Sequence, residues 1–270
     1  MELIPKKVKD CDVLYYESYS LDEQQLLNKL ENLFNNWIEE LKKNEIDGFL
    51  FRDYKSTDLC FDGFYPNYFS QEPKILFIGK EALGLSGNNY LSTLFHAYKN
   101  NDVDGKSLDQ AKFHRLIIYV AYGILHSIRN YHDLPYASDL INNLGSKDLS
   151  YAFMNISKFS NDSGNYQADN ELIEKFVEIS TKSPETNFIY KQIELLNPDL
   201  IITMNISNYF ARIGNISAME YNGGNEIKPY TLKINNKDVL LIDSYHFSYF
   251  AMKDESFYKS ICDFYHNIKK

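Results

Sequence analysis

The chain has 270 residues, of which 44% are apolar and 15% aromatic, so it can bury a large core. No apolar run reaches the roughly 18 residues that a membrane span needs, and residues 1–18 lack the apolar segment of a signal peptide. We therefore expect a cytoplasmic protein with no membrane partner. The formal net charge of −9 excludes a uniformly basic nucleic-acid-binding protein, so any such site must be a local basic patch.

Three helices are predicted in chain order. The first follows a capping-box pattern at Ser20 and continues to about residue 41, with apolar residues at helical spacing. A second box at Ser107 precedes the apolar segment 113–128, and a third helix begins near Pro184. We interpret residues 1–60 as an N-terminal helical extension packed on the core of one domain, residues 61–270, and expect a monomer.

Four short apolar runs between these helices predict buried strands. Each is too short and too apolar for a surface helix, and each ends in polar residues. The runs are KILFIG (74–79), YAFMNIS (151–157), DLIITMN (199–205) and DVLLIDS (238–244). The pattern predicts the α/β class, as a three-layer α/β/α sandwich with a four-stranded, mostly parallel central sheet.

The cysteines and the glycines exclude several kinds of site. Cys11, Cys60 and Cys262 are far apart and have no Cys-x-x-Cys spacing, so neither a disulfide framework nor a zinc or iron–sulfur site is expected. The glycines after the strand at 74–79 match neither a P-loop nor a dinucleotide-binding fingerprint. We expect no metal and no cofactor.

Polar residues follow all four predicted strands. In an open α/β sheet the ligand crevice lies outside the carboxyl ends of the strands, so these residues are the candidates for a site. They are Lys80, Glu81, Asn155, Lys158, Asn205, His246 and Ser248. Each has an ordinary structural alternative, such as capping a turn or bonding loop backbone, and only their joint placement indicates a functional site.

The order of these motifs resembles the uracil-DNA glycosylase superfamily over about residues 61–265. ILFIGKEALG is similar to that family's first motif, with Glu81 at the place of the acid. AFMNISKFS is similar to the second, with Asn155 and then Lys158, and YKQIELLNPDLIITMN (190–205) is similar to the helix and third strand of the iron–sulfur branch. VLLIDSYHFSYF is similar to the last motif, with His246 followed by Phe247 and Ser248.

The chain departs from the family pattern in three ways. Ala82 and Phe247 stand where the first and last motifs have proline, and the cysteines that hold the iron–sulfur cluster are missing. In the branch most efficient on uracil an aromatic side chain follows the acid by two residues, and here that position is the aliphatic Leu83. The resemblance therefore leaves open which base would be removed.

The chemistry of N-glycosidic cleavage requires the residue types found here. A carboxylate is needed near the sugar, which becomes positive, and a hydrogen-bond donor is needed at the departing base. Glu81 and His246 are the candidates for these catalytic roles. Asn155 can read the edge of a flipped pyrimidine, because an amide both donates and accepts.

Further residues are candidates for contacts with the base and with DNA. The base-binding candidates, besides Asn155, are Leu83, Tyr90 and Phe95. The candidates for gripping phosphates or filling the vacated stack are Lys80, Lys158, Phe247, Ser248, Tyr249 and Lys253. For the aromatic residues the alternative is core packing, in a chain with 22 Tyr and 18 Phe.

We therefore expect a monofunctional DNA glycosylase acting on a uracil-like or modified pyrimidine in single- or double-stranded DNA. Two alternatives stay open at this point. One is a non-catalytic module that binds a nucleotide or a protein on the same scaffold, which the acidic balance and the lost prolines favour. The other is a glycosylase for a hypermodified base in a conflict between host and virus.

Overall fold

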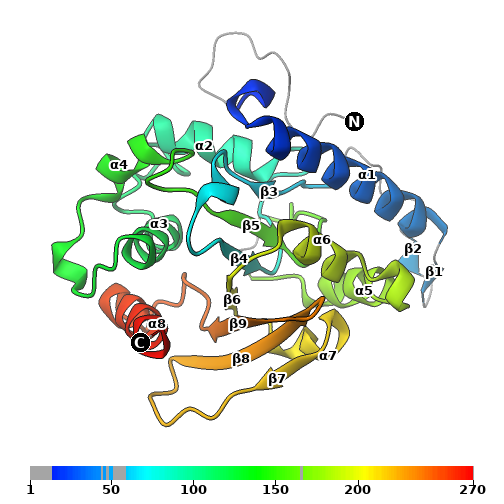
Figure 1. Ribbon diagram of the computed structural model, residues 1–270. Helices are drawn as coiled ribbons and strands as arrows, with labels where there is room; N and C mark the ends of the chain where they lie inside the picture. Colours follow the sequence, from blue (N-terminus) through cyan, green and yellow to red (C-terminus); the bar gives the residue numbers. More distant parts are fainter. Residues whose placement is uncertain (1–13, 44, 47–48, 51–58, 165–166, 270) are drawn as a thin grey trace.

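A single seven-stranded sheet runs through the computed structural model, which describes residues 14–43, 45–46, 49–50, 59–164 and 167–269 (Figure 1). The strand order is β3-β5-β4-β6-β9-β8-β7. The strands are β3 (Gly63–Phe64), β4 (Ile75–Gly79), β5 (Ala152–Asn155), β6 (Leu200–Met204), β7 (Ile216–Ala218), β8 (Ile227–Ile234) and β9 (Lys237–Ser244). A separate antiparallel pair is formed by β1 (Glu45–Ile46) and β2 (Phe49–Leu50).

The centre of the sheet is parallel. Strands β5, β4, β6 and β9 are neighbours in that order, and each pairs in parallel with the next. They coincide with the four apolar runs of the sequence, and every residue of β4, β5 and β6 is buried. Because they are parallel, their carboxyl ends lie at one edge of the sheet, where Gly79 is in register with Asn155.

The α/β class is confirmed, but the predicted number of four strands is wrong. Strand β3 adds to one side of the parallel strands in antiparallel orientation, through β5. On the other side β8 pairs antiparallel with β9, and β7 pairs antiparallel with β8. The sheet is therefore mixed, with a parallel centre and antiparallel edges.

Helices cover both faces of the sheet (Figure 1). The helices are α1 (Leu21–Lys43), α2 (Tyr90–Lys99), α3 (Lys112–Leu125), α4 (Ala137–Leu140), α5 (Asn170–Ser180), α6 (Phe188–Leu196), α7 (Phe210–Ile213) and α8 (Asp254–Ile268). Helices α1, α5 and α6 pack together on one face, and α3 and α8 pack together on the other. The sheet edge with the strand ends is thereby left between two helical layers.

Helix α1 starts where the sequence predicts. The Ser20 N–H donates to Glu23 Oε2 (3.1 Å), and the Glu23 N–H donates to Ser20 Oγ (3.4 Å), as a capping box requires. The apolar stripe that follows places Trp37 against α5 and α6, where its ring lies 5.3 Å from Phe176 and 5.4 Å from Phe188. The described part of the N-terminal extension is thus packed on the core.

The second capping-box pattern makes a turn instead of a helix start. The Ser107 N–H donates to Gln110 Oε1 (3.3 Å), but α3 begins only at Lys112, after the N-cap residue Ala111.

Within the described residues no helix is long and apolar enough to cross a membrane. Cys60 and Cys262 are buried free thiols, and Cys11 lies outside the described residues.

Candidate functional site

Asn155 lies at the carboxyl end of β5, beside the end of β4. Asn155 is only 3% exposed. If a Cβ atom were added at Gly79, on the neighbouring strand β4, it would lie 2.6 Å from Asn155 Oδ1. A side chain at residue 79 would therefore displace the amide of Asn155 from this position. Among the described residues the side-chain amide of Asn155 has no hydrogen-bond partner, so a nearly buried donor and acceptor are left for a ligand.

The backbone of Asn155 is held by a buried ionic network. Asp62 accepts a hydrogen bond from the Asn155 N–H (2.8 Å), and the Lys158 ammonium donates to the Asn155 carbonyl (2.7 Å). Lys158 also donates to both carboxylate oxygens of Asp62 (2.8 Å each), and Gln192 Nε2 donates to Asp62 Oδ1 (2.6 Å). The network fixes the point at which β5 ends.

The position of Lys158 contradicts its predicted contact with phosphate. The side chain is 1% exposed, and its ammonium lies over the rings of Phe34 (5.6 Å) and Trp37 (5.5 Å) from α1. Burial lowers the pKa of Lys158, and the carboxylate of Asp62 opposes this shift. Lys158 is therefore a structural residue behind the site, and the prediction that it grips DNA is wrong.

Glu81 follows β4 and is half-buried. Its Oε1 accepts hydrogen bonds from the Asp169 N–H (2.9 Å) and from Asn161 Nδ2 (3.2 Å). Its Oε2 is buried and has no hydrogen-bond partner in the described part of the chain. Burial raises the pKa of Glu81, although these two donors act against that shift. One carboxylate oxygen is thus anchored while the other is unused.

His246 follows β9 and is neutral at physiological pH. Its ring stacks on Phe113 of α3, with centroids 5.1 Å apart and planes inclined by 19°. Burial, with a smaller effect from the charge of Lys80, lowers the pKa of His246 to about 4. Nδ1 accepts a hydrogen bond from the Ser248 N–H (3.3 Å), so the single proton of the neutral ring is on Nε2. No partner for this Nε2–H is found among the described residues.

Lys80 acts electrostatically on both Glu81 and His246. Burial has the larger effect on both groups, raising the pKa of Glu81 and lowering that of His246. The positive charge of Lys80 opposes the shift of Glu81 and adds to the shift of His246. The side chain of Lys80 is partly exposed. The charge of Lys80 therefore acts on both predicted catalytic residues.

Two predicted contacts with base or DNA are wrong because the side chains belong to the core. Phe247 is fully buried, and its ring packs against Phe257 of α8 at 5.5 Å. Tyr90 is 7% exposed and stacks on Phe153 of β5, with centroids 4.7 Å apart. Both rings are thus used for packing, which was the alternative for the aromatic residues.

Phe95 and Leu83 differ in what they can contact. The ring of Phe95 is partly buried, 6.0 Å from the ring of Tyr65, and has the ammonium of Lys99 over it at 5.3 Å. These contacts tie Phe95 to α2 and the core instead of to the strand ends. Leu83 is 44% exposed, two residues after Glu81, and remains a candidate for contact with a ligand.

Exposed aromatic side chains surround His246 in sequence, and we define residues 245–253 as the aromatic loop. Phe250 is 91% exposed, and the stacked rings of Tyr245 and Tyr249, 5.2 Å apart, are each more than 40% exposed. Lys112 Nζ holds the loop by donating to the carbonyls of Tyr249 (2.8 Å) and Met252 (2.5 Å). The loop is an apolar projection beside the site.

The remaining loop residues and the strand β6 border the site. Ser248 and Lys253 are exposed, so both are accessible for contact with a ligand. Asn205 is exposed at the end of β6 and lines a cavity of about 60 Å³, together with Asp243 and Ser244 of β9. The strand ends therefore carry a small polar hollow next to the aromatic loop.

No family model, no curated protein and no solved structure is similar enough to the chain to be matched with it. Sequence reasoning missed Asp62, Gln192 and Phe113, which hold Asn155 and His246. No local motif marks these three residues, because each acts on a partner more than 90 positions away.

We expect the protein to lose stability in mild acid. Burial lowers the pKa of His246 and of His114 to about 4, whereas in the unfolded chain histidine has a pKa of about 6.5. The unfolded chain therefore binds more protons than the folded one, and the free energy of unfolding should fall by about 1 kcal/mol per histidine between pH 7 and 5.5. Urea denaturation at both pH values measures this change. In the double variant His114→Gln/His246→Gln the loss should be smaller by about 2 kcal/mol, and an unchanged pH dependence would contradict the assignment.

Proposed function

We propose that the protein is a DNA glycosylase that hydrolyses the N-glycosidic bond of a flipped uracil-like or modified pyrimidine. One observation carries the proposal. Glu81, Asn155 and His246, which follow or end separate parallel strands, each retain a hydrogen-bonding atom without a partner in the described chain. Glu81 Oε2 is buried, and buried polar atoms are normally paired. Together with the unpaired amide of Asn155 and the Nε2–H of His246 at the same edge of the sheet, it favours a polar ligand at this edge. The motif resemblance to uracil-DNA glycosylases supports the same choice.

The three residues suit the charges that form when the bond breaks. As the bond between C1′ and the base nitrogen opens, the sugar becomes positive and the base takes both bonding electrons. The carboxylate of Glu81 stabilises the sugar and takes a proton from the attacking water, whose oxygen bonds to C1′. The neutral His246 donates its Nε2–H to the base oxygen that becomes negative, and Lys80 adds a positive charge nearby.

Asn155 supplies selection of the base. Its amide can donate to a carbonyl and accept from an imide N–H, which is the pattern at the edge of uracil. The buried network of Asp62 and Lys158 keeps the amide in one place, as selection requires. Leu83 is aliphatic and exposed, and a substituent on the pyrimidine ring could be accommodated there.

The aromatic loop suits the task of filling the space that a flipped nucleotide leaves. Proteins that distort DNA commonly insert apolar side chains between bases. Phe250 is the most exposed large apolar side chain of the described residues, and Tyr249 lies next to it at a ring distance of 5.8 Å. These two residues replace the buried Phe247 as the candidates for insertion.

Phe250→Ala is expected to weaken binding to duplex DNA with a uracil-type lesion by about tenfold, because base–aromatic stacking contributes about 1–3 kcal/mol. Binding to single strands, which need no flipping, should change less. Fluorescence anisotropy with both DNA forms measures the difference. Leu21→Ala, an exposed apolar residue at the start of α1, is the matched control and should bind as the wild type does. Equal losses on both DNA forms would contradict an inserting role.

A module that binds a nucleotide without cleaving it is the second candidate. The net charge of −9 favours it, as does the burial of Lys158, which removes one cation from the surface of the site. Among the described residues near the strand ends, the lysines left accessible are Lys80 and Lys253. Two cations suit the phosphates of one nucleotide better than a long stretch of duplex.

The decisive experiment offers the protein oligonucleotides, both single- and double-stranded, that carry uracil, hydroxymethyluracil or glucosylated cytosine. Alkaline cleavage then reveals abasic sites. We expect abasic sites on at least one substrate and DNA affinity that falls with salt. If no substrate is cleaved and no salt-sensitive affinity is found, the glycosylase proposal fails and the nucleotide-binding module is favoured.

A further inference from the structure

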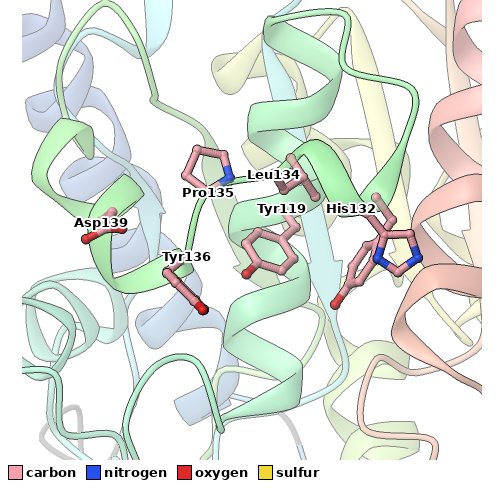
Figure 2. Close-up of a pocket in the computed structure, with 7 residues that line it drawn as sticks. Tyr119, His132, Leu134, Pro135, Tyr136 and Asp139 are labelled. Carbon is pink, nitrogen blue, oxygen red and sulfur yellow. The ribbon is translucent and has the colours of Figure 1, made fainter.

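A cavity of about 400 Å³ is separate from the strand ends. It lies among α3, the turn Tyr131–Asp133 and the segment that enters α4, and none of its lining residues belongs to the candidate site. Figure 2 shows the lining side chains, which include Tyr119, Tyr136 and Asp139. The glycosylase proposal assigns no role to this cavity.

Three tyrosine rings line the cavity. Tyr119 of α3 is 7% exposed, and its ring meets that of Tyr131 edge to face at 5.7 Å. Tyr131 in turn lies against Tyr258 of α8, also at 5.7 Å, so these two lining rings are fixed by packing. Tyr136 is 70% exposed, although it lines the same cavity. A ligand in the cavity would cover the ring of Tyr136 and would also meet two rings that packing holds in place.

The charge around the cavity is negative. Asp139 lines it and has no ion-pair or side-chain hydrogen-bond partner in the described part of the chain. Asp109 and Asp133 nearby are bonded to the neutral side chains of Ser138 and Asn130. Neither lysine nor arginine is among the lining residues.

The cation that acts electrostatically on two of these rings is already neutralised. Arg115 of α3 acts electrostatically on Tyr119 and Tyr131, but its guanidinium forms an ion pair with Asp254. On the rim His132 faces Glu255 at 3.6 Å, and that carboxylate is paired with Lys259. The carboxylate of Asp139 is thus left as the uncompensated charge on the cavity wall.

We propose that this cavity binds a small organic cation of the alkylammonium class, with methylated or quaternary nitrogen. The faces of aromatic rings attract such cations, and a carboxylate beside the rings adds to the attraction. A bare metal ion would need several converging oxygen ligands, whereas the described residues contain no cluster of acidic, histidine or cysteine side chains that could hold one. A neutral apolar ligand would leave Asp139 unused.

The test uses choline as the probe and 3,3-dimethylbutan-1-ol, its uncharged isostere, as the matched comparison. Both are titrated into the full chain and followed by NMR chemical shifts or calorimetry. We expect saturable binding of choline at least tenfold tighter than binding of the isostere, since charge is the sole large difference between them. Equal affinities, or no saturable binding of choline, would overturn the proposal.

Variants then locate the site. Tyr136→Ala should weaken choline binding at least fivefold, Tyr136→Phe should retain it because the ring and not the hydroxyl is required, and Asp139→Asn should weaken it severalfold. Tyr249→Ala removes a less exposed tyrosine ring, 42% against 70% for Tyr136, from the aromatic loop and should leave choline binding unchanged. Tyr136, Asp139 and Tyr249 are exposed, so substituting them should leave the protein folded. Thermal denaturation of each variant checks this. Loss of binding in Tyr249→Ala, or its retention in Tyr136→Ala, would place the cation elsewhere and overturn the proposal.

Discussion

Asp62→Ala is expected to lower the free energy of unfolding by about 3–5 kcal/mol, because removing one partner of a buried ion pair leaves the other without compensation. The side chains of Asp62 and Lys158 are 0% and 1% exposed, so the ammonium would lose its carboxylate partner while it is shielded from bulk water. Gln192 Nε2 and the Asn155 N–H would lose their acceptor as well. Urea denaturation, followed by circular dichroism, measures the change.

Glu39→Ala is the control for Asp62→Ala. Glu39 forms an exposed ion pair with Lys42 on α1, and pairs of this kind contribute about 0–1 kcal/mol. The double variant Asp62→Leu/Lys158→Met should recover part of the lost stability, since apolar replacement of a whole buried pair is often tolerated. If Asp62→Ala costs no more than Glu39→Ala, the buried network does not hold the end of β5.

The same network links helix α1 to the site. The ammonium of Lys158 lies against Phe34 and Trp37 on one side and bonds to the carbonyl of Asn155 on the other. Without α1 the ammonium would be open to water, and its bonds to Asp62 and Asn155 would weaken. Helix α1 therefore helps to hold the site in place, although it contributes no residue to the site itself.

The parallel strands were predictable from sequence, and the antiparallel strands β3, β7 and β8 were not. Strands β4, β5, β6 and β9 are short apolar runs, which buried parallel strands require. Strands β3 and β7 have two and three residues, too few for a periodic signal. Strand β8 alternates between buried and exposed residues, but Pro229 within it argues against a strand in any sequence reading.

The location of the site at the strand ends was predictable from sequence, but the directions in which its side chains point were not. Glu81, Asn155 and His246 lie where the rule for open α/β sheets places ligand-binding residues. Whether Lys158 reaches solvent depends on Asp62, 96 positions away in the sequence, and on α1. The burial of Phe247 depends in the same way on α8, which follows it in the chain. Such tertiary contacts leave no trace in local spacing.

Glu81→Gln is expected to slow base release by about 100-fold on whichever oligonucleotide the protein cleaves, because the charge that stabilises the sugar and accepts the proton of water is lost. The free energy of unfolding should change by less than about 1 kcal/mol, since the oxygen of the introduced amide would still accept a hydrogen bond from the Asp169 N–H. Single-turnover cleavage with excess protein separates this loss from any change in DNA binding.

The pH dependence of release distinguishes the acid from the histidine. Burial raises the pKa of Glu81, so wild-type release should fall as the pH is lowered through that raised pKa and the active carboxylate becomes protonated. His246, with a pKa of about 4, is still neutral in this range and does not contribute to the loss. The slow release that remains in Glu81→Gln should therefore be independent of pH over the same interval. Glu171→Gln changes an exposed carboxylate in the first turn of α5 and should keep both the wild-type rate and its acid limb. An acid limb that persists in Glu81→Gln would assign the titration to another group and leave Glu81 with a structural role.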